Sequence, residues 1–122
     1  MRYMLLIYDD EKRWGKMSEQ ERGAIFRQYR EFTESIRQGG AFEAGAPLQP
    51  TSTATTVRGK NGKTVTTDGP FAETKEQLGG YYIVEAKDLD EAISIAARIP
   101  SVRVGGSIEV RPIMEMGPPP RK

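Results

Sequence analysis

The side chains best suited to chemistry gather in one stretch of the sequence, from Asp68 to Tyr81. It contains a carboxylate ahead of Gly-Pro, the charged residues Glu73, Lys75 and Glu76, and a Gly-Gly pair before the tyrosine. Strand-like segments flank the stretch, and its length of about ten residues exceeds what a tight hairpin needs. Because long charged connections often carry function, we expect a binding or catalytic site here.

Asp68 and Tyr81 are the candidate catalytic residues. Burial in a cleft raises the pKa of a carboxylate towards neutral pH, and such a group can act as a general base. A tyrosine hydroxyl beside it would polarise the substrate. The structural alternatives are an aspartate that accepts hydrogen bonds from turn N–H groups, and a core tyrosine whose hydroxyl is satisfied.

Four further residues are candidates for ligand binding: Arg111, Lys75, Glu76 and Trp14. A guanidinium in a cleft suits a carboxylate ligand, although Arg111 also fits an ion pair at a rim or an interface. Lys75 and Glu76 form either an ion-pair cluster around Asp68 or a solvated charge run. Trp14 is expected in the loop before the first helix, as an anchor or as part of a lid.

Composition excludes several classes of function. The 122 residues contain no histidine and no cysteine, which removes thiolate catalysis, the commonest general base and the usual ligands of transition metals and haem. We therefore expect no metal and no cofactor. Basic and acidic residues nearly balance, 18 against 17, so we expect neither nucleic acid nor membrane as a partner. The apolar N-terminal run is too short for a signal segment, which predicts a cytoplasmic protein.

Two helices are predicted. Ser18 and Glu21 form a capping box that begins the first, and Gly39-Gly40 ends it. Its apolar residues recur at helical spacing, at Ile25, Tyr29, Phe32 and Ile36. The second helix is predicted from Asp88 to Pro100, with Leu89, Ala92, Ile93 and Ala96 on its buried side.

Six strands complete the pattern. They are predicted at 2–8, 41–46, 54–58, 63–67, 81–84 and 107–113, with a hairpin turn at Asn61-Gly62. The order β-α-β-(β-hairpin)-β-α-β predicts an α+β, ferredoxin-like domain over residues 1–114, with both helices on one face of the sheet. Residues 115–122 are predicted to be a flexible Pro-rich tail.

Strands 2–8 and 81–84 are apolar on both faces, so both should be central and covered on both sides. Two helices cover only one face. A second copy of the chain is the economical cover for the other, which predicts a homodimer.

The ordered set of motifs resembles the DGPF proteins, a branch of the YCII-related family. The resemblance runs through Tyr3–Tyr8, Trp14 with Ser18 and Glu21, Thr53–Arg58, Asp68–Tyr81, and Ile99-Pro100 with Ile108–Pro112. It implies a bacterial protein with the dimeric α/β-barrel fold and a cleft in each protomer, in a family often encoded near extracytoplasmic-function sigma factors. A histidine–aspartate couple proposed for related proteins cannot form here, and Asp68 is the candidate for its aspartate.

Two functional hypotheses follow. The first is a small-molecule-binding protein or, more specifically, a cofactor-independent enzyme of proton transfer, isomerisation or elimination. The alternative is a non-catalytic ligand-sensing or accessory module linked to sigma-factor regulation. A perturbed carboxylate beside a ligand-sized cavity favours the first, and a shallow cleft with a fully ion-paired aspartate favours the second.

Overall fold

A computed structural model describes residues 1–117, and residues 118–122 of the predicted tail lie outside the described residues. The elements in chain order are β1 (Arg2–Asp9), α1 (Glu11–Lys16), α2 (Glu19–Gln38), β2 (Phe42–Pro47), η1 (Thr51–Thr53), β3 (Thr55–Lys60), β4 (Lys63–Asp68), β5 (Gln77–Glu85), α3 (Leu89–Ala96), η2 (Pro100–Val104) and β6 (Ser107–Pro112). None of the helices in this part of the chain is long and apolar enough to cross a membrane.

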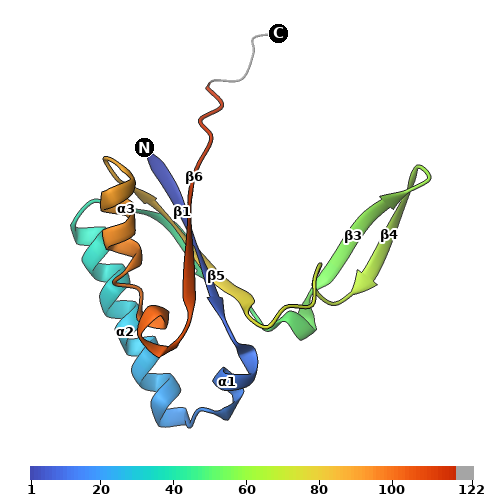
Figure 1. Ribbon diagram of the computed structural model, residues 1–122, viewed down its shortest axis with the longest axis horizontal. Coiled ribbons are helices and arrows are strands. Elements are labelled where there is room, and N and C mark those ends of the chain that lie inside the picture. Colours follow the sequence, from blue (N-terminus) through green and yellow to red (C-terminus); the bar gives the residue numbers. More distant parts are fainter. Residues whose placement is uncertain (118–122) are drawn as a thin grey trace.

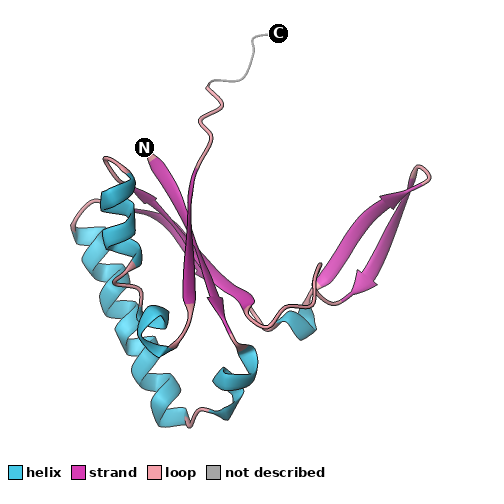
Figure 2. Ribbon diagram, in the orientation of Figure 1, coloured by secondary structure: helices cyan, strands magenta, loops and turns pink. Residues whose placement is uncertain are grey.

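The main sheet has four strands in the order β2-β5-β1-β6, paired antiparallel throughout. Helices α2 and α3 lie together on one side of it (Figures 1 and 2). This mixed α+β arrangement is compatible with the predicted ferredoxin-like layout. The two strands predicted to be central, β1 and β5, are central.

Strands β3 and β4 form a separate two-stranded sheet, which we call the arm (Thr55–Asp68). Its turn is the predicted Asn61-Gly62 pair, and both residues have positive φ, 51° and 77°. The arm stands away from the main sheet (Figure 1). Residues 69–76 must lead the chain back from the arm to β5, and this return path explains the length of the connection.

The helix α2 begins as predicted. Ser18 accepts a hydrogen bond from the Glu21 N–H at 3.1 Å, and the Glu21 carboxylate accepts one from the Ser18 N–H at 3.0 Å. These bonds hold the pKa of Glu21 below its usual value. Phe32 and Ile36 then face the sheet, so the predicted stripe is buried.

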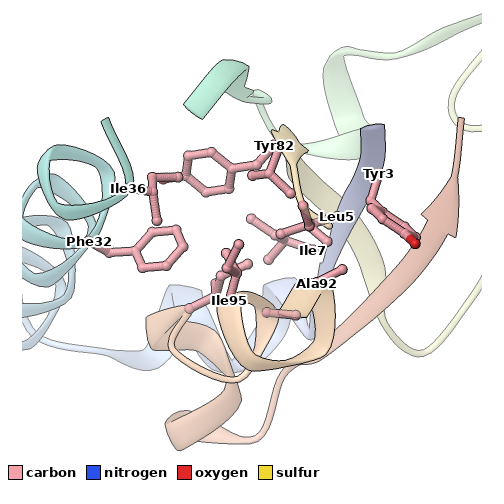
Figure 3. Close-up of a cluster of buried hydrophobic side chains, with 12 residues drawn as sticks. Tyr3, Leu5, Ile7, Phe32, Ile36, Tyr82, Ala92 and Ile95 are labelled. Carbon is pink, nitrogen blue, oxygen red and sulfur yellow. The ribbon is translucent and has the colours of Figure 1, made fainter. Parts of the chain in front are cut away.

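The core lies between α2, α3 and the inner face of β1 and β5. Alternate residues of β1 point into it, together with Tyr82 and Val84 of β5. Figure 3 shows Tyr82 beside Phe32 and Ile36, and the aromatic pair meets edge to face at 5.3 Å between ring centroids. Such pairs fix ring orientation as well as burying area.

The prediction for the second helix is wrong in part. Asp88 caps α3 by accepting the Glu91 N–H at 2.9 Å, as expected. However, Leu89 and Ile93 are about half exposed, at 49% and 48%, and Ile95 takes a buried place instead. The helix spans only two turns, so the sheet covers a narrower stripe than the spacing suggested.

The face of the main sheet away from the helices is apolar along its central strands. Met4 and Leu6 of β1 and Ile83 of β5 lie there, each only partly buried, because their alternate neighbours point into the core. The register places Glu109 and Arg111 of β6 opposite Leu6 and Met4, on this same face. We call it the open face.

Candidate functional site

A cavity of about 1210 Å³ lies between α1, α2 and one end of the main sheet. Its size slightly exceeds the ~300–1,000 Å³ typical of small-molecule sites. Six of the ten aromatic residues in the protein border it, out of one Trp, five Tyr and four Phe. The aromatic lining residues are Trp14, Phe26, Tyr29, Phe42, Tyr81 and Tyr82.

The polar centre of the cavity is a chain of three side chains: Asp9, Ser101 and Tyr29. The Ser101 hydroxyl donates to Asp9 Oδ2 at 2.9 Å, and the Tyr29 hydroxyl lies 2.5 Å from Ser101 Oγ. Because the single proton of Ser101 is directed to Asp9, Tyr29 donates to Ser101. The three groups form one hydrogen-bonded relay with the carboxylate as its final acceptor.

Burial changes the acidity of both ends of this relay. It raises the pKa of Asp9, which opposes the effects of the Ser101 hydrogen bond and the nearby Arg13, both of which lower it. The negative charge of Glu76 raises the pKa of Asp9 further. Burial also raises the pKa of Tyr29, to about 12. Tyr29 is therefore a neutral donor at physiological pH, whereas Asp9 titrates above the usual range of an aspartate.

Strand alternation and a close glycine contact position the carboxylate. Asp9 continues the inward-facing series of β1 through Leu5 and Ile7, so it enters the cavity at the end of the strand. A Cβ on Gly106 would overlap Asp9 Oδ1 and lie 2.9 Å from Ser101 Cβ. Only glycine therefore fits at this position without displacing the acid.

A second hydroxyl pair supports the wall formed by α2. Thr33 donates to the Tyr29 carbonyl at 2.8 Å, and its Oγ1 lies 2.6 Å from the Tyr82 hydroxyl. The Tyr82 proton therefore points to Thr33. Burial raises the pKa of Tyr82, so this phenol is also neutral.

Glycines form part of the sheet side of the cavity. A Cβ on Gly45 would lie 2.7 Å from the Tyr82 ring, and one on Gly80 would lie 3.0 Å from the Ala46 carbonyl oxygen. Both positions line the cavity. Side chains there would overlap their neighbours, and the bare backbone leaves room above the sheet.

The base of the arm is hydrogen-bonded to α1. The Glu11 carboxylate accepts from the Thr51 N–H at 2.9 Å and from the Thr51 hydroxyl at 2.6 Å. The Glu11 N–H donates to Gln77 Oε1 at 2.9 Å. We call these three residues the latch. They join the entrance and exit of the arm to the helix that carries Trp14.

Two of the residues predicted as site members line the cavity. Trp14 lies on α1, a short helix where a loop was expected, with its ring 5.5 Å from that of Phe26 in an edge-to-face pair. Tyr81 is also among the residues that line the cavity, but the register sets it opposite Leu6, so its side chain lies on the open face, and its neighbour Tyr82 points into the core instead.

The remaining predicted residues lie elsewhere. Asp68 is exposed at the end of β4, opposite Thr55, and is not among the cavity-lining residues. Arg111 is exposed on the open face and Lys75 is exposed in the connection. Glu76 is partly buried and accepts from the Ser107 hydroxyl at 3.3 Å, close enough to influence Asp9.

Sequence reasoning missed Asp9, Ser101 and Tyr29 as a unit. The strand pattern held one usable signal, because extending the inward series Tyr3, Leu5, Ile7 by two residues reaches Asp9. Ser101 carries no comparable signal, since it lies 92 residues away and meets the acid only through tertiary folding.

Within residues 1–117, no three His, Cys, Asp or Glu side chains gather in a way that would hold a metal ion. The absence of a metal from the functional protein stays a prediction of composition.

The fold and site define a small α+β protein with helices on one sheet face and a carboxylate-containing cavity beneath them. The family model of the YCII-related domain matches residues 1–117, and the chain belongs to that family. It is also 38% identical over 114 residues to "Uncharacterized protein R00369" of Rhizobium meliloti (strain 1021), covering 93% of this chain and 92% of that protein. Membership of the DGPF branch stays a prediction.

Proposed function

We propose that this protein binds a small organic molecule in its cavity and that Asp9 exchanges a proton with it. The observation that carries the proposal is a partly buried carboxylate with a raised pKa, aimed into an aromatic-lined cavity of ligand size. Perturbed carboxylates in clefts are characteristic of functional sites. No cofactor is required for proton transfer of this kind.

The relay suits a general base. Ser101 donates to one carboxylate oxygen of Asp9, which fixes the plane of the group and leaves lone pairs on the other oxygen for a substrate. Tyr29 holds the Ser101 hydroxyl in that orientation. An acid–base group placed in this way contributes about 10²–10⁴-fold to a proton transfer. Isomerisation and elimination are the reaction classes that such a step serves.

The walls indicate the shape of the ligand. Trp14 and Phe26 present an edge-to-face pair, and Gly45 and Gly80 leave bare backbone on the sheet side. A flat, mostly apolar molecule fits between such surfaces, with one hydrogen-bond donor or acidic C–H directed at Asp9. The role predicted for Tyr81 stays a prediction, because the register places its side chain on the open face, opposite Leu6.

We also propose that two copies pair through their open faces, as in a dimeric α/β barrel. Met4, Leu6 and Ile83 support this, because they form an apolar stripe that the helices of the same chain do not cover. An exposed apolar surface of that kind favours association. The cytoplasmic location and the sigma-factor link stay predictions.

The test uses a panel of small phenols, aromatic acids and carbonyl compounds. Trp14 is the sole tryptophan of the protein and lines the cavity, so its fluorescence reports occupancy directly. Each hit is then incubated with the protein and followed by mass spectrometry and by solvent-deuterium incorporation. Wild type is compared with Asp9→Asn and with Asp68→Asn, which makes the same chemical change on the exposed arm.

We expect Asp9→Asn to abolish turnover and weaken binding at least tenfold, with Asp68→Asn like wild type. Loss of function in Asp68→Asn alone would refute the assignment of the site to the cavity. Hits that bind through Asp9 but are never converted would refute catalysis and favour the alternative, a ligand sensor.

A further inference from the structure

The arm is joined to α1 through the latch at its base, and its strands extend away from the rest of the described chain (Figure 1). Within residues 1–117 its two strands pair only with each other, and every arm residue except Thr56 is exposed. An isolated two-stranded hairpin is marginally stable in water at best, and its free edges invite pairing with another chain. A persistent arm of this kind therefore requires contacts from outside the protomer.

An apolar patch lies on one face of the arm and continues at Phe71, three residues beyond the arm. Val65 lies opposite Arg58 in the register, and the Arg58 guanidinium stacks 5.4 Å from the centre of the Phe71 ring. Phe71 is 77% exposed and Val65 is 40% exposed. We call these three residues the arm patch. A large aromatic ring held in place by a cation and left in water is typical of a contact surface.

The direction of the arm relates it to the open face. Helices α2 and α3 lie on one side of the main sheet, and the arm projects on the other (Figure 1). A partner protein that packs on the open face, against Met4, Leu6 and Ile83, therefore lies on the same side of the sheet as the arm.

The contact area of the open faces is small for a stable dimer, and the arms would enlarge it. Four strands spaced about 4.8 Å apart and about 23 Å long present roughly 450 Å² in projection. Stable pairs bury about 800 Å² per partner. One face of the arm measures about 20 Å by 10 Å, and in a two-fold pair each protomer both gives and receives one arm. Two such contacts add about 400 Å² of projected area and nearly double the contact that the open faces alone provide.

The net charges of the arm and of the rest of the chain are compatible with contact between two copies of this chain. The arm holds three of the 18 basic residues and one of the 17 acidic ones, so it carries +2 and the rest of the chain carries −1. The arm and the rest of a second copy therefore carry net charges of opposite sign and do not repel each other.

We propose that the arm is a clasp that grips a second copy of this chain, with the arm patch against the partner's body. The proposal rests on the proposed dimer and adds the element that stabilises it. In the dimer each arm packs against the other protomer. Both hairpins, which are exposed in the separate chains, are then buried in the interface.

Two single substitutions test the clasp. Val65→Asp and Phe71→Ser remove the apolar patch, and Thr66→Asp introduces the same charge one residue away, on the opposite face of the arm. Sedimentation equilibrium gives the dimer dissociation constant of each protein. Far-UV circular dichroism and Trp14 fluorescence check that the main sheet and cavity are intact. Hydrogen exchange of residues 55–68 is measured at concentrations above and below that constant.

We expect Val65→Asp and Phe71→Ser to raise the dissociation constant at least tenfold, with less than a threefold change for Thr66→Asp. Arm amides should be protected in the dimer and exchange rapidly on dilution. A wild-type dimer that is unaffected by both patch substitutions would overturn the clasp and leave the sheet-to-sheet dimer standing. A wild type that is monomeric at about 100 μM would overturn both.

Discussion

Replacing Ser101 by alanine tests the relay most directly. The substitution removes the hydroxyl that Tyr29 donates to and that donates to Asp9, so two hydrogen bonds are lost at once. Each is worth about 1 kcal/mol net, and Tyr29, the more buried partner, is left without an acceptor. Because Asp9 retains access to water in the cavity, we expect a total loss of about 2 kcal/mol in the free energy of unfolding.

The assay is thermal unfolding followed by circular dichroism, at one protein concentration for all variants. With an unfolding entropy of about 2.1 cal/mol/K per residue, a chain of this length loses about 4 °C per kcal/mol. Ser101→Ala should therefore lower the Tm by about 8 °C. The control is Ser94→Ala, at an exposed position of α3, which should leave the Tm unchanged or slightly higher. A fall of less than 2 °C for Ser101→Ala would show that the relay does not stabilise the fold.

Two further predictions concern the same acid. A carboxyl whose folded-state pKa is raised binds more protons folded than unfolded, so its ionisation lowers stability as the pH rises from about 4 through the folded pKa. Asp9→Asn should therefore have a higher free energy of unfolding than wild type at pH 7 and the same value as wild type at pH 3. Urea unfolding at both pH values measures this. An equal difference between variant and wild type at the two pH values would contradict the raised pKa. Gly106→Ala should displace Asp9 and lower the Tm by more than 4 °C, whereas Gly23→Ala, in an open helical position, should raise the Tm.

Local signals in the sequence were sufficient for most of the fold. The capping box at Ser18 and Glu21, the Asn61-Gly62 turn and the alternation of β1 each depend on neighbouring residues, and each is present in the structure. The burial of α3 was less predictable. Which side of a two-turn helix is covered depends on the position of the sheet, which the helical spacing of Leu89 and Ile93 does not encode.

The candidate site was harder to predict than the fold. Asp9 stands in the acidic run Asp9-Asp10-Glu11, and its neighbours have separate tasks: Asp10 caps α1 and Glu11 belongs to the latch. Residue type alone cannot distinguish the three. Asp68 is conspicuous in the sequence because Gly and Pro follow it, but in the structure it ends an exposed hairpin, and the Gly69 that follows has a φ of 105°. A turn motif is visible in sequence, whereas a cavity is assembled from distant segments.

The latch connects the arm to the wall of the cavity. Glu11 holds both Thr51 and Gln77, the two ends between which the arm extends, and it lies on the same short helix as Trp14. If the proposed dimer forms, a partner that holds the arm would also hold α1 in place, and with it Trp14 in the wall of the cavity. Linkage then requires reciprocity: whatever factor dimerisation adds to ligand affinity, the ligand adds to dimer affinity. In such a dimer, occupancy of the cavity would depend on the concentration of the protein itself.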